Sequence, residues 1–132
     1  MSNATILKEN HAESHANMDV VIQYINRVWN QKKLEELFDY LDDDYVDHSM
    51  PHVTFQNKEW LLLYLGELAQ TVYHTTEIVG LTTLGELVIC HIRITVSALC
   101  MTDVVDQETE AFYGYRMFRI FYGKIAEHWE II

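Results

Sequence analysis

The sequence is poor in proline, glycine, cysteine and positive charge, and each shortage excludes a class of protein. It has one proline and five glycines in 132 residues, while 49% of its residues are hydrophobic. Disordered and low-complexity chains have the opposite composition. A chain of this length fits one domain around one core. We therefore expect a single folded domain, over residues 16–132.

Positive charge is scarce throughout the chain. Nine basic side chains stand against 20 acidic ones, which gives a formal charge of −11. A phosphate backbone would be repelled, and no basic cluster offsets this, so we expect no nucleic-acid partner. Anionic membrane surfaces are disfavoured too, and no apolar run approaches the ~20 residues that span a bilayer. We expect no membrane partner.

The N-terminal segment lacks the features of a targeting sequence. Residues 1–15 are polar and aperiodic, which predicts a flexible tail. Its second to fourth residues, Ser-Asn-Ala, resemble the remnant of a cleaved purification tag. Because no apolar segment of a signal peptide is present, we expect a cytoplasmic protein.

Cysteine occurs only at Cys90 and Cys100. On one continuous strand the two residues would lie roughly 33 Å apart, far beyond the ~7 Å limit for bridged alpha carbons. We expect two reduced thiols that pack as small hydrophobic side chains.

Apolar residues at intervals of three and four predict three helices in the first half of the chain. The first covers residues 16–31, the second 34–41, and the third begins after the N-cap Asn57 and ends near Val72. Residues 45–52 read as a loop or short extended segment, because Pro51 disfavours helix before it.

The period changes from 3.6 to 2 after Tyr73. Strands are predicted at residues 75–84, 87–101, 111–121 and 124–132, with an acidic connection over 103–110 and a hairpin turn at Tyr122-Gly123. In the strand 87–101 every second residue is apolar, which predicts one core face. Helices followed by antiparallel strands predict an α+β fold, with three helices packed on a curved, mainly antiparallel sheet.

The strand 111–121 is apolar on both faces. Phe112, Phe118 and Ile120 lie on one face, and the other carries Tyr113, Tyr115, Met117 and Phe121. Helices cover one side of a sheet, so the second face needs another partner. We expect a homodimer.

Two segments carry a resemblance to a known family. DDDYVDHSMP and FRIFYGKIAEHWEII, in this order of helices and strands, resemble the SnoaL-like polyketide cyclases of the nuclear transport factor 2-like superfamily, from Met18 to Ile132. The resemblance implies a cone-shaped cavity with His48 at its mouth or wall and Trp129 inside. This superfamily includes isomerases, dehydratases, epoxide hydrolases, cyclases and non-catalytic domains, among which the fold does not decide.

The end of the sequence departs from that pattern. In the cyclases an aspartate a few residues after the tryptophan that matches Trp129 is the acid/base, and this sequence ends at Ile132 before such a residue. Either the sequence is truncated relative to the pattern or the activity does not use that aspartate. Strand alternation places Ile125, Glu127, Trp129 and Ile131 on one face, so Glu127 would be able to supply a carboxylate to the cavity instead.

His48 and Glu127 are the candidate catalytic residues. A histidine near a cavity mouth titrates near neutrality and suits a general base, whereas the alternative is a loop histidine bonded to Asp47 or the backbone. An apolar setting beside Trp129 would make Glu127 a general acid. The alternative is a rim glutamate paired with Arg93 or Arg119.

Aromatic residues supply the candidate substrate contacts. These are Trp129, Tyr45, Tyr113, Tyr115 and Trp60. A tyrosine from the group Tyr45, Tyr64, Tyr73, Tyr113 and Tyr115 would donate to a developing enolate, or these residues serve in packing. His91 and Arg93 share the polar face of the long strand, where they reach a substrate carboxylate or line a subunit interface.

No motif for a metal or cofactor is present. His11 and His15 have helical spacing but not the H-E-x-x-H order, and no glycine-rich phosphate loop occurs. We expect no metal and no cofactor. The sequence predicts a domain that binds a small hydrophobic or cyclic carbonyl compound, as an isomerase or cyclase that removes a proton next to the carbonyl. The alternatives are a non-catalytic hydrophobic-ligand-binding or dimerisation domain and, third, a protein-interaction module.

Overall fold

The computed structural model describes residues 3–50, 55–98 and 109–132, with side chains in the first helix from residue 12 onward. Helices are α1 (Asn3–Tyr24), its π-helical extension η1 (Ile25–Asn30), the 3-10 turn η2 (Leu34–Glu36), α2 (Leu37–Tyr40) and α3 (Lys58–Thr71). Strands are β1 (Leu41–Asp47), β2 (Val72–Leu84), β3 (Leu87–Ala98), β4 (Thr109–Phe121) and β5 (Lys124–Ile131).

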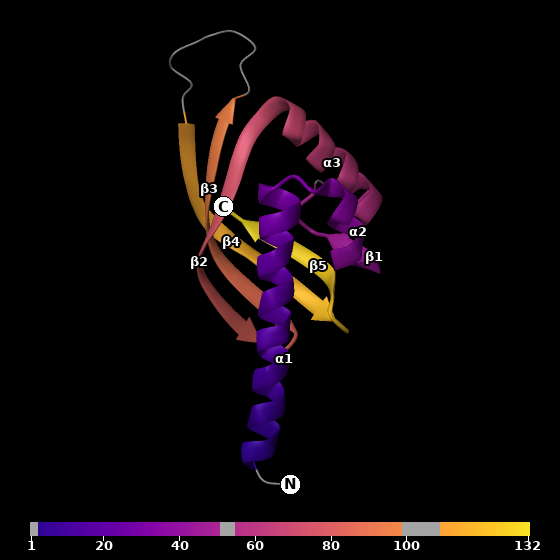
Figure 1. The fold of residues 1–132 in the computed structure, drawn as a ribbon, viewed down its shortest axis with the longest axis vertical. Helices are drawn as coiled ribbons and strands as arrows, with labels where there is room; N and C mark the ends of the chain where they lie inside the picture. Colours follow the sequence, from indigo (N-terminus) through magenta and orange to yellow (C-terminus); the bar gives the residue numbers. More distant parts are fainter. Residues whose placement is uncertain (1–2, 51–54, 99–108) are drawn as a thin grey trace.

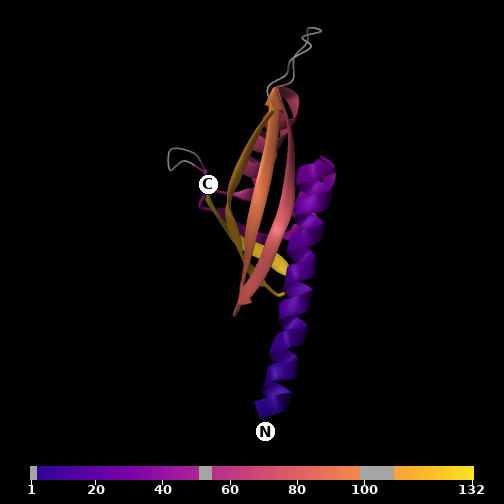
Figure 2. The same ribbon diagram turned by 90° about the vertical axis from the view of Figure 1, so that its left-hand side faces the viewer.

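The strands form one mixed sheet in the order β1-β5-β4-β3-β2. β1 pairs with β5 in parallel, and the other pairs are antiparallel. Figure 1 shows α1 running along the sheet and α3 beside its upper half. The view turned by 90° shows the strands curving, with α1 on one side (Figure 2). The α+β fold of helices on a curved, mainly antiparallel sheet is confirmed.

The core lies between the helices and the inner face of the sheet. Val88, Cys90 and Ile92 of β3 are fully buried there, which confirms the predicted core face of this strand. The helical side of the core is formed by Val21, Tyr24, Ile25, Val28, Leu37, Leu61 and Leu65. Cys90 is a free thiol whose pKa is raised by burial to about 12, so it is unreactive.

The helix boundaries agree with the sequence in two places and differ in one. Asn57 is the N-cap of α3, and its side chain accepts a hydrogen bond from the Trp60 amide at 3.0 Å. The break after the first helix is confirmed at Lys32, which has a φ of 60°. The first helix, however, begins at Asn3, well before Ala16. Neither glycine nor proline interrupts it, so helical propensity extends it where the apolar period is absent.

β1 begins earlier than the extended segment that the sequence predicts. The strand starts at Leu41 and includes the three acidic residues 42–44, and its register with β5 shifts between Leu41 and Val46. Parallel pairing with the last strand brings Asp47 opposite His128. This pairing joins two segments far apart in the chain, and no local pattern indicated it.

The β4–β5 hairpin has the predicted two-residue turn. Tyr122 and Gly123 both have positive φ, 46° and 78°, as a type I′ turn requires. Ile120 pairs with Ile125, but Arg119 pairs with Glu127. Ala126 is therefore an extra residue, a β-bulge, and both it and Ile125 are buried.

Some predictions lie outside the described residues: those on Pro51, Cys100, Met101 and most of the acidic connection 103–110. The flexibility of residues 1–15 stays a prediction. Among the described helices, none combines the length and the apolar character of a membrane span.

Candidate functional site

A cavity of about 620 Å³ lies between the inner face of the sheet and the helices. This volume is in the range of small-molecule sites. Polar side chains in its wall come from β1 and the residues after it, from α3 and from β2, β4 and β5. They are Asp47, Ser49, Tyr64, His74, Thr76, Arg116 and Glu130. The remaining lining residues are Trp29, Met50, Leu61, Leu68, Val72, Ile94, Val96, Phe112 and Ile132.

The bulge decides which residues of β5 reach this cavity. Strict alternation from Ile125 would place Glu127 and Trp129 on the inner face with it. Because Ala126 is inserted, the alternation shifts by one residue, and His128 and Glu130 face inward instead. The predicted orientation of Glu127 and Trp129 toward the cavity is therefore wrong.

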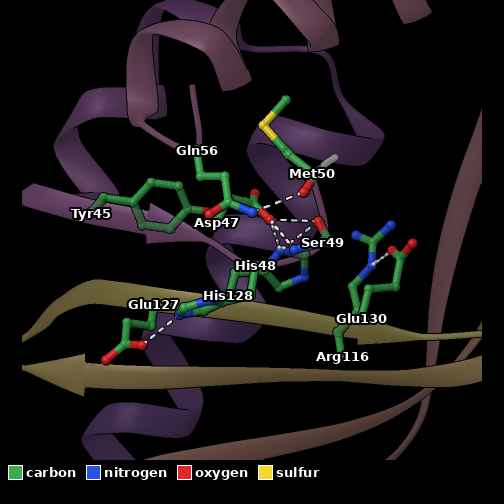
Figure 3. Close-up of polar contacts among 10 residues, drawn as sticks. All are labelled: Tyr45, Asp47, His48, Ser49, Met50, Gln56, Arg116, Glu127, His128 and Glu130. Atoms are coloured by element: carbon green, nitrogen blue, oxygen red, sulfur yellow. Dashed lines mark hydrogen bonds and ion pairs between the residues drawn. The ribbon is translucent and has the colours of Figure 1, made fainter. Parts of the chain in front are cut away.

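Asp47 is the centre of a polar cluster on the inner face (Figure 3). It is 1% exposed and accepts hydrogen bonds from the Ser49 amide at 3.0 Å, the Tyr45 hydroxyl at 2.7 Å and His128 Nδ1 at 3.1 Å, as well as from the Ser49 hydroxyl. Burial raises the pKa of Asp47, but the hydrogen bonds from His128, Ser49 and Tyr45 outweigh it and lower the pKa to about 2. Asp47 is ionised near neutral pH.

The arrangement of Ser49, Asp47 and His128 is not a hydrolytic triad. Ser49 Oγ and Asp47 Oδ1 both lie nearest to the same ring atom, Nδ1, at 3.5 and 3.1 Å. A triad needs the serine at one ring nitrogen and the carboxylate at the other. His128 Nε2 is buried without a hydrogen-bond partner among the described residues, and the ring stacks on Phe118 with centroids 4.9 Å apart.

A second polar pair, Arg116 and Glu130, joins β4 to β5 in the cavity wall. Arg116 Nε donates to Glu130 Oε2 at 2.8 Å, and the guanidinium lies 4.1 Å above the Trp29 ring. Arg116 is 4% exposed, and its Nη1 has no partner among the described residues. One signal in the sequence pointed to it: an arginine on the apolar face of a strand, between Phe112 and Phe118, where an unpaired charge is not expected.

His74 and Thr76 of β2 complete the polar wall. Lys32 Nζ lies 3.0 Å from His74 Nε2 and donates to the His74 carbonyl at 3.0 Å. Burial and the positive charges of Lys32 and Arg116 lower the pKa of His74 to about 4. His74 is thus neutral near pH 7, with Nε2 accepting from the lysine and the proton on Nδ1.

The predicted catalytic pair does come together, but on the outer face of the sheet. His48 Nε2 and Glu127 Oε2 are 2.7 Å apart, and the His48 ring stacks on Trp129 with centroids 4.9 Å apart at 8°. Arg119 Nε donates to Glu127 Oε1 at 2.7 Å, which is the ion pair weighed as the alternative. Hydrogen bonds from His48 and Arg119 hold the pKa of Glu127 below its ordinary value.

The predicted aromatic contacts are spread over the molecule. Tyr45 is buried and reaches the site only through Asp47. Tyr113 and Tyr115 lie exposed on the outer face, and Trp60 packs against Phe55, with ring centroids 6.0 Å apart. None of these four lines the cavity.

Tyr64 of α3 is the tyrosine that lines the cavity. Its pKa is raised by burial, so the phenol keeps its proton. Two other candidates, His91 and Arg93, lie on the outer face, where His91 stacks on Tyr115 and Arg93 is 3.8 Å from Glu77.

The described residues contain no group of three or more histidine, cysteine, aspartate or glutamate side chains that would hold a metal ion. The chemistry available in the cavity is that of carboxylates, an arginine, a phenol, a hydroxyl and imidazoles.

Comparison with known proteins identifies the fold. The sequence matches no protein-family model and no curated protein. Solved structures do match. An LEH-like epoxide hydrolase from M. tuberculosis superposes with a TM-score of 0.73 at 14% identity, over 89% of this chain and 79% of that one. A putative polyketide cyclase from Xanthomonas campestris superposes with a TM-score of 0.73 at 12% identity, over 88% of this chain and 89% of that one.

A SnoaL-like polyketide cyclase from Agrobacterium tumefaciens gives a TM-score of 0.69 at 14% identity, over 87% of this chain and 89% of that one. At such identities the likeness concerns the fold. The chain has the nuclear transport factor 2-like fold of these cyclases and epoxide hydrolases, as the two sequence segments indicated.

Proposed function

We propose that this protein binds a small carbonyl compound in the cavity and moves a proton next to the carbonyl, as a cofactor-independent isomerase or cyclase. The observation that carries the proposal is Glu130, a carboxylate in the wall of a cavity of about 620 Å³. The shared fold with polyketide cyclases supports the reaction class by analogy alone.

Glu130 suits the role of base better than Asp47. Asp47 is saturated with hydrogen bonds and has a pKa of about 2, so it is a weak base. Arg116 holds only Oε2 of Glu130, and no described residue donates a hydrogen bond to Oε1. Oε1 would take the proton from carbon, the C–H electrons would form a C=C bond, and the π electrons of the carbonyl would move onto its oxygen to give an enolate. Return of the proton to another carbon completes an isomerisation.

Tyr64 is the proposed donor to the enolate oxygen. It lines the same cavity and is 46% exposed, and its partial burial raises the pKa of a phenol that is protonated near neutral pH in any case. A neutral donor that meets the charge formed in the transition state stabilises it more than the ground state. Tyr64 was among the tyrosines considered for this role from the sequence.

The test compares two glutamates on opposite faces of one strand. Deuterium incorporation next to the carbonyl of 2-tetralone, followed by NMR in heavy water, measures proton transfer without knowledge of the natural substrate. Glu130→Gln should lower the exchange rate by roughly 100-fold or more. Glu127→Gln and His48→Ala should leave it unchanged.

The opposite result would move the chemistry to the outer face. If Glu127→Gln or His48→Ala abolishes exchange and Glu130→Gln does not, the pair predicted from the sequence carries the reaction. If wild-type protein binds cyclic ketones and catalyses no exchange, the second candidate applies: a non-catalytic binding domain. The hydrogen-bond saturation of Asp47 favours that candidate.

We also propose that the outer face of β2–β4 pairs with a second copy of the chain. Tyr73, Tyr113 and Tyr115 are 62%, 61% and 48% exposed there. Burying large aromatic side chains is the main driving force of such interfaces. Sedimentation velocity should show a dimer that Tyr113→Glu converts to a monomer, and a monomeric wild type would refute the pairing.

A further inference from the structure

We infer that one end of the cavity, formed by His74, Thr76 and Arg116, binds a carboxylate group of the ligand. The three side chains come from β2 and β4 and all line the cavity. The inference rests on the proposed function in one respect, that the cavity is the ligand site. It adds the chemical class of the ligand: a cyclic or aromatic carboxylic acid.

Hydrogen-bonding capacity is left unused at this end of the cavity. His74, Thr76 and Arg116 are 6%, 4% and 4% exposed. Thr76 Oγ1 and Arg116 Nη1 are buried, and neither has a hydrogen-bond partner among the described residues. Buried polar atoms without partners are costly and rare in native proteins. The two oxygens of a ligand carboxylate would supply the missing partners.

The neighbouring residues fix these groups in place. The Asn30 side chain holds the Thr76 backbone from both sides, accepting from its amide at 2.7 Å and donating to its carbonyl at 2.8 Å. Lys32 holds His74 by the ring and the carbonyl, which directs the ring proton to Nδ1. Arg116 is held by Glu130 through Nε and by the Trp29 ring, so the terminal guanidinium nitrogens remain for a ligand. Such preorganised donors lose little entropy on binding.

The charges at this end favour an anion over a neutral group. Arg116 and Lys32 both place positive charge near His74. Glu130 binds Arg116 through Nε alone, and the carboxylate of Asp47 is hydrogen-bonded to Tyr45, Ser49 and His128 and not to Arg116. A guanidinium binds a carboxylate more strongly than a neutral carbonyl, because the hydrogen bonds are charge-assisted.

The rest of the wall indicates a hydrophobic ligand body. Apolar side chains of η1, α3, β2, β3 and β4 surround the remaining volume: Trp29, Leu61, Leu68, Val72, Ile94, Val96 and Phe112. The ligand that fits is therefore amphipathic, with one anionic end and an apolar ring system.

The experiment compares 2-naphthoate with 2-naphthamide by isothermal titration at pH 7. In both probes the carbon next to the carbonyl carbon carries no hydrogen. A base therefore has no proton to remove there, and binding is measured apart from turnover. Wild-type protein should bind the carboxylate at least tenfold more tightly than the amide. On addition of 2-naphthoate, the His74 ring signals should shift in NMR spectra.

Thr76→Val provides the decisive variant. Valine has nearly the shape of threonine and removes a hydroxyl that has no partner, so stability should be unchanged or raised, while affinity for 2-naphthoate should fall about tenfold. Thr75→Val is the matched control, because Thr75 is the next residue of β2 and points to the exposed outer face. This variant should bind as the wild type does.

Several results would overturn the inference. Equal affinity for the two probes, no binding of 2-naphthoate, or an unchanged affinity in Thr76→Val would each do so. Glu130→Gln separates the two proposals: it should abolish exchange of 2-tetralone and retain or strengthen binding of 2-naphthoate. Loss of exchange with no carboxylate preference would leave the proposed function in place and refute the carboxylate site.

Discussion

The two faces of the β1–β5 strand pair carry the same chemistry in different surroundings. On the inner face Asp47 contacts His128 at 3.1 Å, with side chains 1% and 3% exposed. On the outer face Glu127 contacts His48 at 2.7 Å, with side chains 26% and 36% exposed. The outer contact is shorter, yet the inner pair matters more for stability. A charge left unpaired in the interior is costly, whereas one left unpaired at the surface is solvated.

The two carboxylates on the inner face, Asp47 and Glu130, have different roles. The inner pair is surrounded by further hydrogen bonds from Tyr45 and Ser49, which hold the carboxylate ionised and fixed. Glu130, two residues beyond His128, keeps one oxygen available in the cavity. The most buried carboxylate therefore stabilises the fold, and its less constrained neighbour is the candidate for proton transfer.

The largest expected effect is the loss of Asp47. Asp47→Asn removes the charge that His128, Ser49 and Tyr45 surround, and should lower the free energy of unfolding by about 3–5 kcal/mol. Urea denaturation followed by circular dichroism measures this. Asp43→Asn is the control, since Asp43 is 98% exposed and pairs with Lys58 at the surface. A loss below about 1 kcal/mol for Asp47→Asn would show that the inner cluster is dispensable.

A smaller effect is expected from acid. Because the pKa of Asp47 is depressed to about 2 from an ordinary 3.8, its contribution to stability is present above pH 4 and is lost as pH falls toward 2. The wild type should lose on the order of 2 kcal/mol over this interval from Asp47. Asp47→Asn should show a correspondingly flatter pH profile. Parallel profiles for the two proteins would contradict the assignment.

The smallest effect is expected on the outer face. His48→Ala and Glu127→Gln should each change the free energy of unfolding by about 0–1 kcal/mol, because both side chains are partly solvated. High salt should reduce the difference further. If either substitution lowers the free energy of unfolding as much as Asp47→Asn does, His48 and Glu127 are buried in the working protein. The margin of the proposed dimer interface would bury them in this way.

Local sequence patterns predicted those structural elements well that depend on a single rule, such as a helix cap or a turn. The Asn57 cap, the Tyr122-Gly123 turn and the apolar face of β3 depend on neighbours within a few residues, and all three are confirmed. The start of the first helix was missed, because amphipathic periodicity cannot mark a helical turn with no apolar face.

The candidate site was predictable only in part. His48 and Glu127 were expected to act together, and they are in contact, but outside the cavity that was to hold them. Glu130 and His128 were missed because the alternation along residues 124–131 was taken as unbroken. Asp47 was considered only as a partner of His48, because its contact with His128 depends on the pairing of β1 with β5. One buried alanine inserted at position 126 exchanges the faces of every residue after it.

The sequence alone determined that this chain folds as helices on a curved sheet, with turns and strands at nearly the observed positions, because period and turn chemistry are local. Only the tertiary structure decided which carboxylates enter the cavity. The register of β5 depends on its pairing with β4, and the contact between Asp47 and His128 joins residues 81 positions apart. Such contacts follow from strand order and bulge position, which depend on the packing of the whole sheet.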